Sequence, residues 1–111
     1  MIISLLKLKP ILEKRQHILS ILRFVAEKVR LKRGCLGCGI YEECDEGRLI
    51  LYLEQWQSKE EMNWHIQSNL YLRILNAMDL CIEKPEISFN EVSDTKQFEL
   101  VEALRLNKDL E

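Results

Sequence analysis

The residues that could carry chemistry gather in one segment of the chain, "LYLEQWQSKEEMNWHIQSNLY" (51–71). Glu54 lies between Tyr52 and Trp56 at two-residue spacing, and His65 follows Trp56 by nine residues. Aromatic side chains around a few polar groups are typical of a small-molecule pocket, and a carboxylate in such a cleft can accept a proton. The segment therefore predicts a pocket in which Glu54 and His65 meet beside Trp56.

Each of these residues also has a purely structural interpretation. A carboxylate between a helix and a sheet can pair with a Lys or Arg on the first helix, or lie exposed at a cleft edge. His65 shares a helix side with Met62 and Ile66, where a histidine can be an ordinary core residue. A cavity shared by His65, Glu54 and Trp56 favours catalysis, whereas a His65 packed against Met62 and Ile66 without a void favours a binding or structural role.

The elements around this segment follow from its pattern. Residues 49–56 alternate as a strand, with Leu49, Leu51 and Leu53 on one face and Ile50, Tyr52, Glu54 and Trp56 on the other, beneath helices. Ser58 followed by Glu61 is a capping box, which predicts a helix over about 59–78 with a break near Ser68-Asn69. In that helix Trp64 points away from the buried side.

The rest of the chain supplies the other elements. Strands are expected at 2–9, 35–44 and 83–93, a hairpin turn at 45–48 with Gly47 available for positive φ, and helices at 11–31 and 95–107. The order predicts an α+β, ferredoxin-like βαββαβ fold, an antiparallel sheet with helices on one face plus a C-terminal helix. We expect residues 1–93 to form the domain, and 94–111 to form a helix packed on that domain or on a partner subunit.

The strand at 49–56 also predicts a homodimer. Both of its faces are largely apolar, and two helices can cover only one side of the sheet. The same face of a second copy is the simplest cover for the Leu49-Leu51-Leu53 side, in a two-fold contact that would give a dimeric α/β barrel. The last helix is an alternative cover within the chain.

Composition excludes several partners and locations. The net charge of −2, with both signs interspersed, argues against nucleic acid, and the basic cluster Arg30, Lys32 and Arg33 fits a helix C-terminus. The start, "MIISLLKLKP", does not look like a signal peptide, and no stretch approaches the roughly 20 apolar residues of a membrane span. We therefore expect a cytoplasmic protein that does not bind membranes.

Metal and nucleophile motifs are missing from the sequence. There is no G-x-S-x-G, no glycine-rich phosphate loop and no H-E-x-x-H, and His65 lacks further metal ligands at helical spacing, so no metal site is expected. His17 lies among charges and is expected to be solvated.

The four cysteines are interpreted mainly as small apolar residues. They are Cys35, Cys38, Cys44 and Cys81. Strand alternation predicts that Cys35 and Cys38 point to opposite faces. A thiol-dependent function of this pair remains a weaker alternative, which a low-pKa thiol would support.

Several segments resemble the antibiotic biosynthesis monooxygenase family, whose members include quinol monooxygenases. "RGCLGCGIYEE" is similar to its second strand, and "PEISFNEV" to its final strand. "LILYLEQWQSKEEMNWHIQSNLY" resembles its hallmark of an apolar strand, Glu-x-Trp, an acidic helix start, then His and a Ser or Thr three residues later. The resemblance covers roughly residues 1–93.

The resemblance implies a dimeric α/β barrel and an oxygenase that needs no metal or flavin. Such enzymes bind an electron-rich aromatic, help remove a proton and let the anion react with O2. His65 would be the catalytic proton acceptor or anion partner, and Trp56 would stack on a planar ring. Tyr52, Glu54 and Met62 would complete the substrate-binding set.

Departures from the family pattern narrow the substrate. The polyketide-oxidising branch has Asn four residues before the Trp and Tyr six after it, where this chain has Tyr52 and Met62. The heme-degrading branch has its axial His at the position of Leu75. A small quinol or related aromatic is therefore the expected substrate; the alternative is a non-catalytic dimeric barrel that binds a small hydrophobic ligand.

Overall fold

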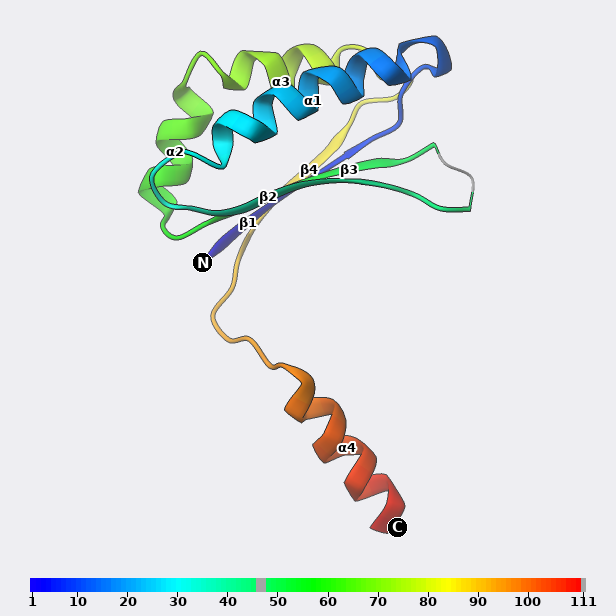
Figure 1. Ribbon diagram of the computed structural model, residues 1–111, viewed down its shortest axis with the longest axis vertical. Helices are drawn as coiled ribbons and strands as arrows, with labels where there is room; N and C mark the ends of the chain where they lie inside the picture. The colour runs from blue at the N-terminus through cyan, green and yellow to red at the C-terminus, as the bar shows by residue number, and fades with distance from the viewer. Residues whose placement is uncertain (46–47, 111) are drawn as a thin grey trace.

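The computed structural model describes residues 1–45 and 48–110, and it confirms the predicted fold class. A four-stranded antiparallel sheet has the strand order β2-β3-β1-β4, and α1, α2 and α3 cover one face of it (Figure 1). The elements are β1 (Ile2–Leu8), a 3-10 turn η1 (Leu12–Lys14), α1 (Arg15–Val29), β2 (Cys35–Glu42), β3 (Ile50–Trp56), α2 (Lys59–Gln67), α3 (Tyr71–Met78), β4 (Glu86–Glu91) and α4 (Phe98–Leu110).

The element boundaries differ from the sequence-based ones by a few residues. The first helix begins at Arg15, because Ile11 is still extended and a 3-10 turn follows it before the α-helix starts. It ends at Val29, short of the predicted Leu31. Gly34 has a φ of 86°, which a side chain would resist, and a Cβ there would collide with the carboxyl group of Glu61. The predicted turn at 45–48 lies partly outside the described residues.

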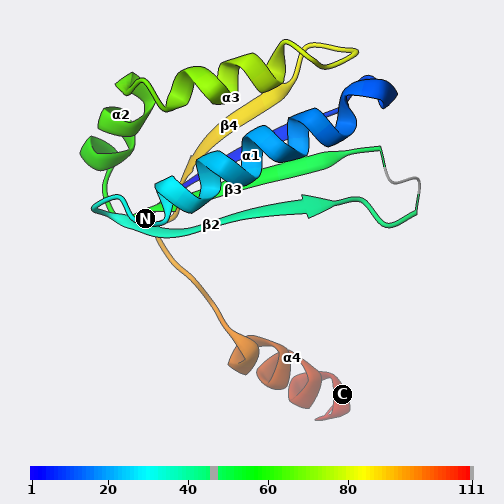
Figure 2. The same ribbon diagram turned by 45° about the horizontal axis from the view of Figure 1, so that its top comes forward.

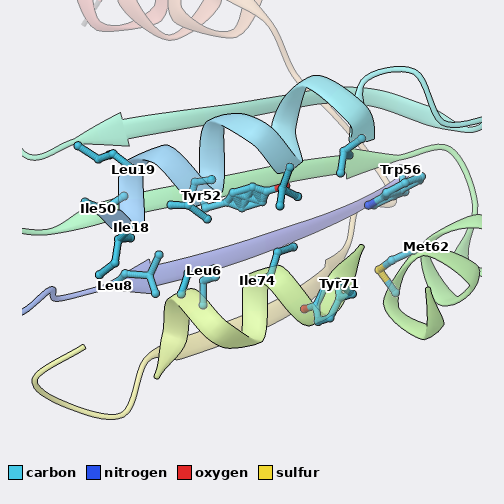
Figure 3. Packing of buried hydrophobic residues seen from close by; sticks show 14 of the residues in the cluster. Leu6, Leu8, Ile18, Leu19, Ile50, Tyr52, Trp56, Met62, Tyr71 and Ile74 are labelled. Atoms are coloured by element: carbon cyan, nitrogen blue, oxygen red, sulfur yellow. The ribbon is translucent and has the colours of Figure 1, made fainter. Parts of the chain in front are cut away.

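The core lies between the sheet and its three helices. Residues from α1, α3 and alternate positions of β1 and β3 form it (Figure 3). The burial of β3 follows the predicted period of two, since Ile50, Tyr52 and Trp56 are buried whereas Leu51 and Leu53 are only half-buried. Burial of these apolar side chains is the main source of stability.

Among the residues that the structure describes, no helix of the same chain covers the opposite face of the sheet. Its residues include Ile3 and Leu5 of β1 and Leu51 and Leu53 of β3, where Leu5 pairs with Leu53. Helix α4 stands away from the sheet at the end of an extended segment (Figures 1 and 2). Residues 98–107 of α4 are exposed, so in the single chain this helix does not pack on its own domain. Packing on a partner subunit remains a prediction.

Candidate functional site

Glu54 is the centre of a buried hydrogen-bonded cluster beneath the helices. The hydroxyl group of Tyr52 donates to Oε2 at 2.8 Å, and the indole nitrogen of Trp56 donates to Oε1 at 3.0 Å. The Nε2 atom of His65 lies 2.8 Å from the same Oε2. Both carboxylate oxygens therefore accept, which is what a buried ionised carboxylate requires.

The local structure explains how these side chains meet. Tyr52, Glu54 and Trp56 share the helix-facing side of β3 because strand residues alternate between faces. Ser58 begins α2: its hydroxyl group accepts from the backbone N–H of Glu61 at 3.3 Å and donates to the carboxylate of Glu61 at 2.8 Å. This start of α2 fixes which side chains of the helix face the sheet.

Helix α2 presents His65 to the sheet, as the spacing predicted. Met62 and His65 are buried at three-residue spacing, while Trp64 points away and is 64% exposed. The helix ends at Ser68, whose backbone is extended, so the predicted break at Ser68-Asn69 is present. The chain resumes as α3 at Tyr71.

Aromatic rings hold the imidazole of His65 on two sides. Its centroid lies 5.1 Å from the Trp56 ring at an interplanar angle of 32°, and 5.3 Å from the Tyr71 ring in an edge arrangement of 83°. Trp56, Met62 and Tyr71 lie at the same end of the core (Figure 3). The spacing of Tyr71 six residues after His65 gave no sign of this contact.

The second ring nitrogen of His65 meets a cation from the loop after α1. The Nζ atom of Lys32 lies 3.0 Å from Nδ1 and donates to the hydroxyl oxygen of Ser68 at 3.1 Å. Ser68 in turn donates to the carbonyl oxygen of His65 at 2.6 Å. The sequence predicted that a cation on the first helix could pair with Glu54. The cation is Lys32, just beyond that helix, and it contacts His65, which in turn contacts the carboxylate group of Glu54. Lys32 belongs to the basic cluster of Arg30, Lys32 and Arg33, which the sequence assigned to a helix C-terminus.

The negative charge of Glu54 affects the pKa values of the neighbouring side chains. Burial, reinforced by the nearby carboxylate, raises the pKa of Tyr52 far above its usual range, and raises the pKa of Tyr71 to about 12. Both tyrosines are therefore uncharged at neutral pH. Burial lowers the pKa of Lys32, and the attraction of Glu54 opposes that shift.

The cluster is almost closed to solvent. Glu54 is 2% exposed, His65 1% and Trp56 0%. Glu54 of β3 pairs with Ser4 of β1, and Ser4 pairs with Phe89 of the edge strand β4, so these three residues form one row across the sheet. The surface is open at the Phe89 end of this row. Phe89 is 45% exposed. The helix-facing side of β4 is thus an accessible apolar surface on the row that leads toward Glu54.

The two cysteines of the C-x-x-C motif lie on one face, contrary to the prediction. A bulge between Cys35 and Gly37 inserts a residue in β2, so that Cys35 pairs with Trp56 and Cys38 pairs with Glu54. The thiol group of Cys38 donates to the hydroxyl oxygen of Tyr52 at 3.3 Å. Burial raises the pKa of Cys35, and that of Cys38 to about 11, which argues against a reactive thiolate pair.

The described residues contain neither a metal centre nor a membrane-spanning helix. Within residues 1–45 and 48–110, no three His, Cys, Asp or Glu side chains converge as metal ligands would. In the same residues, no helix is long and apolar enough to cross a membrane. Leu75, the position of the axial histidine in the heme-degrading branch, is an exposed residue of α3.

Comparison with known proteins places the chain among similar sequences and folds. Residues 1–77 match the family model described as antibiotic biosynthesis monooxygenase. An uncharacterized protein of Synechocystis, sll1783, is 23% identical over 92 residues, which are 82% of this chain. The chain spans only 61% of the length of that relative.

Solved structures share the fold at low sequence identity. Rv0793 of Mycobacterium tuberculosis has a TM-score of 0.79 at 18% identity, covering 86% of this chain and 98% of the other. A conserved protein of Methanosarcina mazei has a TM-score of 0.76 at 22% identity, covering 81% and 90%. A further structure, of an antibiotic biosynthesis monooxygenase, has a TM-score of 0.76 at 13% identity, covering 85% and 100%. These likenesses concern the fold.

Proposed function

Because the chain belongs to the antibiotic biosynthesis monooxygenase family, we propose that it oxidises a small quinol or related aromatic with O2, without a metal or organic cofactor. The substrate itself supplies the electrons. One oxygen atom enters a ring carbon, the substrate loses two hydrogens in total, and the second oxygen atom leaves as water. The protein then has to remove a proton and stabilise the resulting anion.

The observation that supports this proposal is the contact of 2.8 Å between Nε2 of His65 and Oε2 of Glu54, in a site closed to water. A carboxylate that accepts from one ring nitrogen orients the imidazole and stabilises the imidazolium that forms when the other nitrogen takes a proton. His65 is therefore proposed to accept the proton at Nδ1, after the substrate displaces the ammonium group of Lys32 from that nitrogen. Glu54 is proposed to remain an anion, since its oxygens already accept from Tyr52 and Trp56.

The substrate is proposed to enter over β4. Phe89 is exposed on the helix-facing side of β4. It lies two strands away from Glu54 across the sheet, and neighbouring strands are about 4.8 Å apart. An aromatic ring seated over Phe89 would advance toward Met62 and His65, which are buried on the sheet-facing side of α2. Contact with Trp56 and Tyr52 then requires α2 to shift away from the sheet.

We also propose a homodimer built through the open sheet face. Ile3, Leu5, Leu51 and Leu53 lie on the sheet face opposite to the buried one. In the described part of the chain no helix lies over that face (Figure 1). A second copy of the same face would remove this surface from water in a self-complementary contact. Helix α4 extends on that side of the sheet and is proposed to pack on the partner.

Oxygen uptake by metal-stripped protein with a panel of dihydroquinones and anthrones tests the activity. Uptake should exceed the uncatalysed rate, and His65→Ala should lower the turnover number by about 100-fold or more. His17→Ala is the matched control, since His17 is exposed on α1, and it should leave the rate unchanged. Incorporation of one labelled oxygen atom per product distinguishes monooxygenation from peroxide release. No uptake across the panel, or an unaffected His65→Ala variant, contradicts the proposal.

The second candidate is a non-catalytic dimeric barrel that binds a small hydrophobic ligand. The close packing of Trp56, Glu54 and His65 favours it, because these side chains present almost no surface to a substrate. Quenching of tryptophan fluorescence by the same compounds under anaerobic conditions, without oxygen uptake in air, would support this function over the first.

A further inference from the structure

Lys32 and His65 are in contact across 33 positions of sequence, and their chemistry restricts how protons are arranged between them. A lysine ammonium group has three donors and no acceptor. It can therefore satisfy Nδ1 of His65 only if that nitrogen carries a lone pair. The proton of a neutral imidazole then sits on Nε2, where it points at Oε2 of Glu54, 2.8 Å away.

The position of Lys32 is fixed by a second acceptor. Its Nζ atom donates to Ser68 Oγ at 3.1 Å, and Ser68 is anchored to the carbonyl oxygen of His65 at the end of α2. Lys32 is half-buried, whereas Glu54 and His65 are buried. Its ammonium group thus lies at the boundary between solvent and the cluster.

The negative charge of buried Glu54 has to be balanced by one positive charge within the cluster. The titratable groups around the His65 ring are Glu54 from β3, Lys32 from the loop after α1 and Tyr71 from α3. One turn earlier on α2, Glu61 has its own partner in Arg33 at 3.9 Å. Tyr71 is neutral, so the positive charge that balances Glu54 sits on either Lys32 or His65.

We propose that Lys32 is a positioning residue whose ammonium group supplies this positive charge and thereby keeps His65 neutral, with its proton on Nε2. A neutral His65 is what a proton acceptor must be before the reaction, so the catalytic meaning of this role rests on the proposed function. Burial lowers the pKa of Lys32, whereas the attraction of Glu54 favours its ammonium form.

If the charge of Lys32 is removed, we expect the imidazole ring of His65 to become charged instead of staying neutral. A buried carboxylate without a counter-charge is costly, and an imidazole is a stronger base than a carboxylate. In Lys32→Met, His65 therefore takes a second proton from solvent and becomes the cation itself. In Lys32→Arg, a permanent cation remains and the ring stays neutral.

Nitrogen-15 NMR of histidine-labelled protein at neutral pH tests this inference without any need for turnover. In the wild type, the Nδ1 resonance of His65 should be that of an unprotonated nitrogen and the Nε2 resonance that of a protonated one. Lys32→Met should convert both to the imidazolium pattern, and Lys32→Arg should not. Lys59→Met, which removes an exposed lysine of α2, is the control. Far-UV circular dichroism and a cooperative urea transition show that each variant is folded.

Two results would overturn the inference: an imidazolium pattern of His65 in the wild type, or a neutral ring in folded Lys32→Met. If Lys32→Met does not fold, Lys32→Gln, which also lacks the charge, takes its place, and a neutral His65 ring in that folded variant likewise overturns the inference. Oxygen uptake adds a separate readout, because a cationic His65 cannot accept a proton. Uptake by Lys32→Met should be lost near neutral pH and recover as the pH rises, while Lys32→Arg stays active. Absence of uptake in the wild type would count against the proposed function alone.

Discussion

The ring of Trp56 lies against the ring of His65, with centroids 5.1 Å apart and planes inclined by 32°. Both residues also hydrogen-bond to Glu54, through different carboxylate oxygens. In this arrangement the imidazole lies beside the indole ring that was expected to stack on a planar substrate. Substrate stacking on Trp56 would therefore require displacement of His65 together with α2.

Loss of Glu54 should destabilise the fold strongly. Glu54→Ala leaves the hydroxyl group of Tyr52, the indole N–H of Trp56 and one His65 nitrogen without their acceptor. Breaking a buried pair of this kind costs about 3–5 kcal/mol of the free energy of unfolding. Urea denaturation measures the loss. Glu60→Ala, an exposed position of α2, should change the same quantity by less than about 0.5 kcal/mol. Similar midpoints for the two variants would show that the cluster contributes little.

A charge on the open sheet face should separate the proposed dimer. Leu53→Glu places a carboxylate among Leu5, Leu51 and their proposed copies, where its desolvation opposes association. Light scattering at micromolar concentration should give the mass of two chains for the wild type and of one chain for Leu53→Glu. Leu72→Glu, on the exposed side of α3, should remain a dimer. A wild-type protein with the mass of one chain refutes this interface.

The thiol of Cys38 should resist alkylation near neutral pH. Burial raises its pKa to about 11, so its thiolate fraction, and with it the rate, should rise about tenfold per pH unit below that value. Cys44 is exposed and should be modified first. Mass spectrometry of peptides from native protein treated with iodoacetamide between pH 7 and 10 measures both rates. Rapid modification of Cys38 at pH 7 would revive the thiol-dependent alternative.

Stability should fall in alkaline solution because several buried acids keep their protons when folded. The pKa values of Cys38 and Tyr71 are raised from 9.0 to about 11 and from 10.0 to about 12. Below pH 9 both groups are protonated in either state, and their contribution is fully present. Between about pH 9 and 12 the unfolded chain releases protons that the folded chain retains, so the free energy of unfolding decreases as the pH rises.

Urea midpoints between pH 7 and 10.5 would show this decline. Cys38→Ser should make it shallower, because a serine hydroxyl does not titrate in this range. Cys44→Ser is the matched control at an exposed position and should leave the slope as in the wild type. A midpoint that stays constant or rises up to pH 10.5 would contradict the raised pKa values.

Much of the site could be predicted from local pattern. The two-residue period placed Tyr52, Glu54 and Trp56 on the buried face of β3, and the cap at Ser58 with helical spacing turned His65 toward the sheet. These features depend on residues close together in sequence, where backbone geometry alone decides the direction of a side chain. The break of the helix at Ser68 follows for the same reason.

Contacts between distant segments were decided only by the tertiary structure. The bulge at Cys35 and Gly37 puts both cysteines on one face, where opposite faces were predicted, because the register of β2 against β3 is set by how both strands pack. Lys32 reaches His65 because the loop after α1 ends beside the C-terminus of α2, which no spacing along the chain reveals. The sequence by itself therefore determined the fold and the inward direction of Glu54 and His65. Only packing between elements determined which groups complete the cluster, since those contacts depend on three-dimensional proximity.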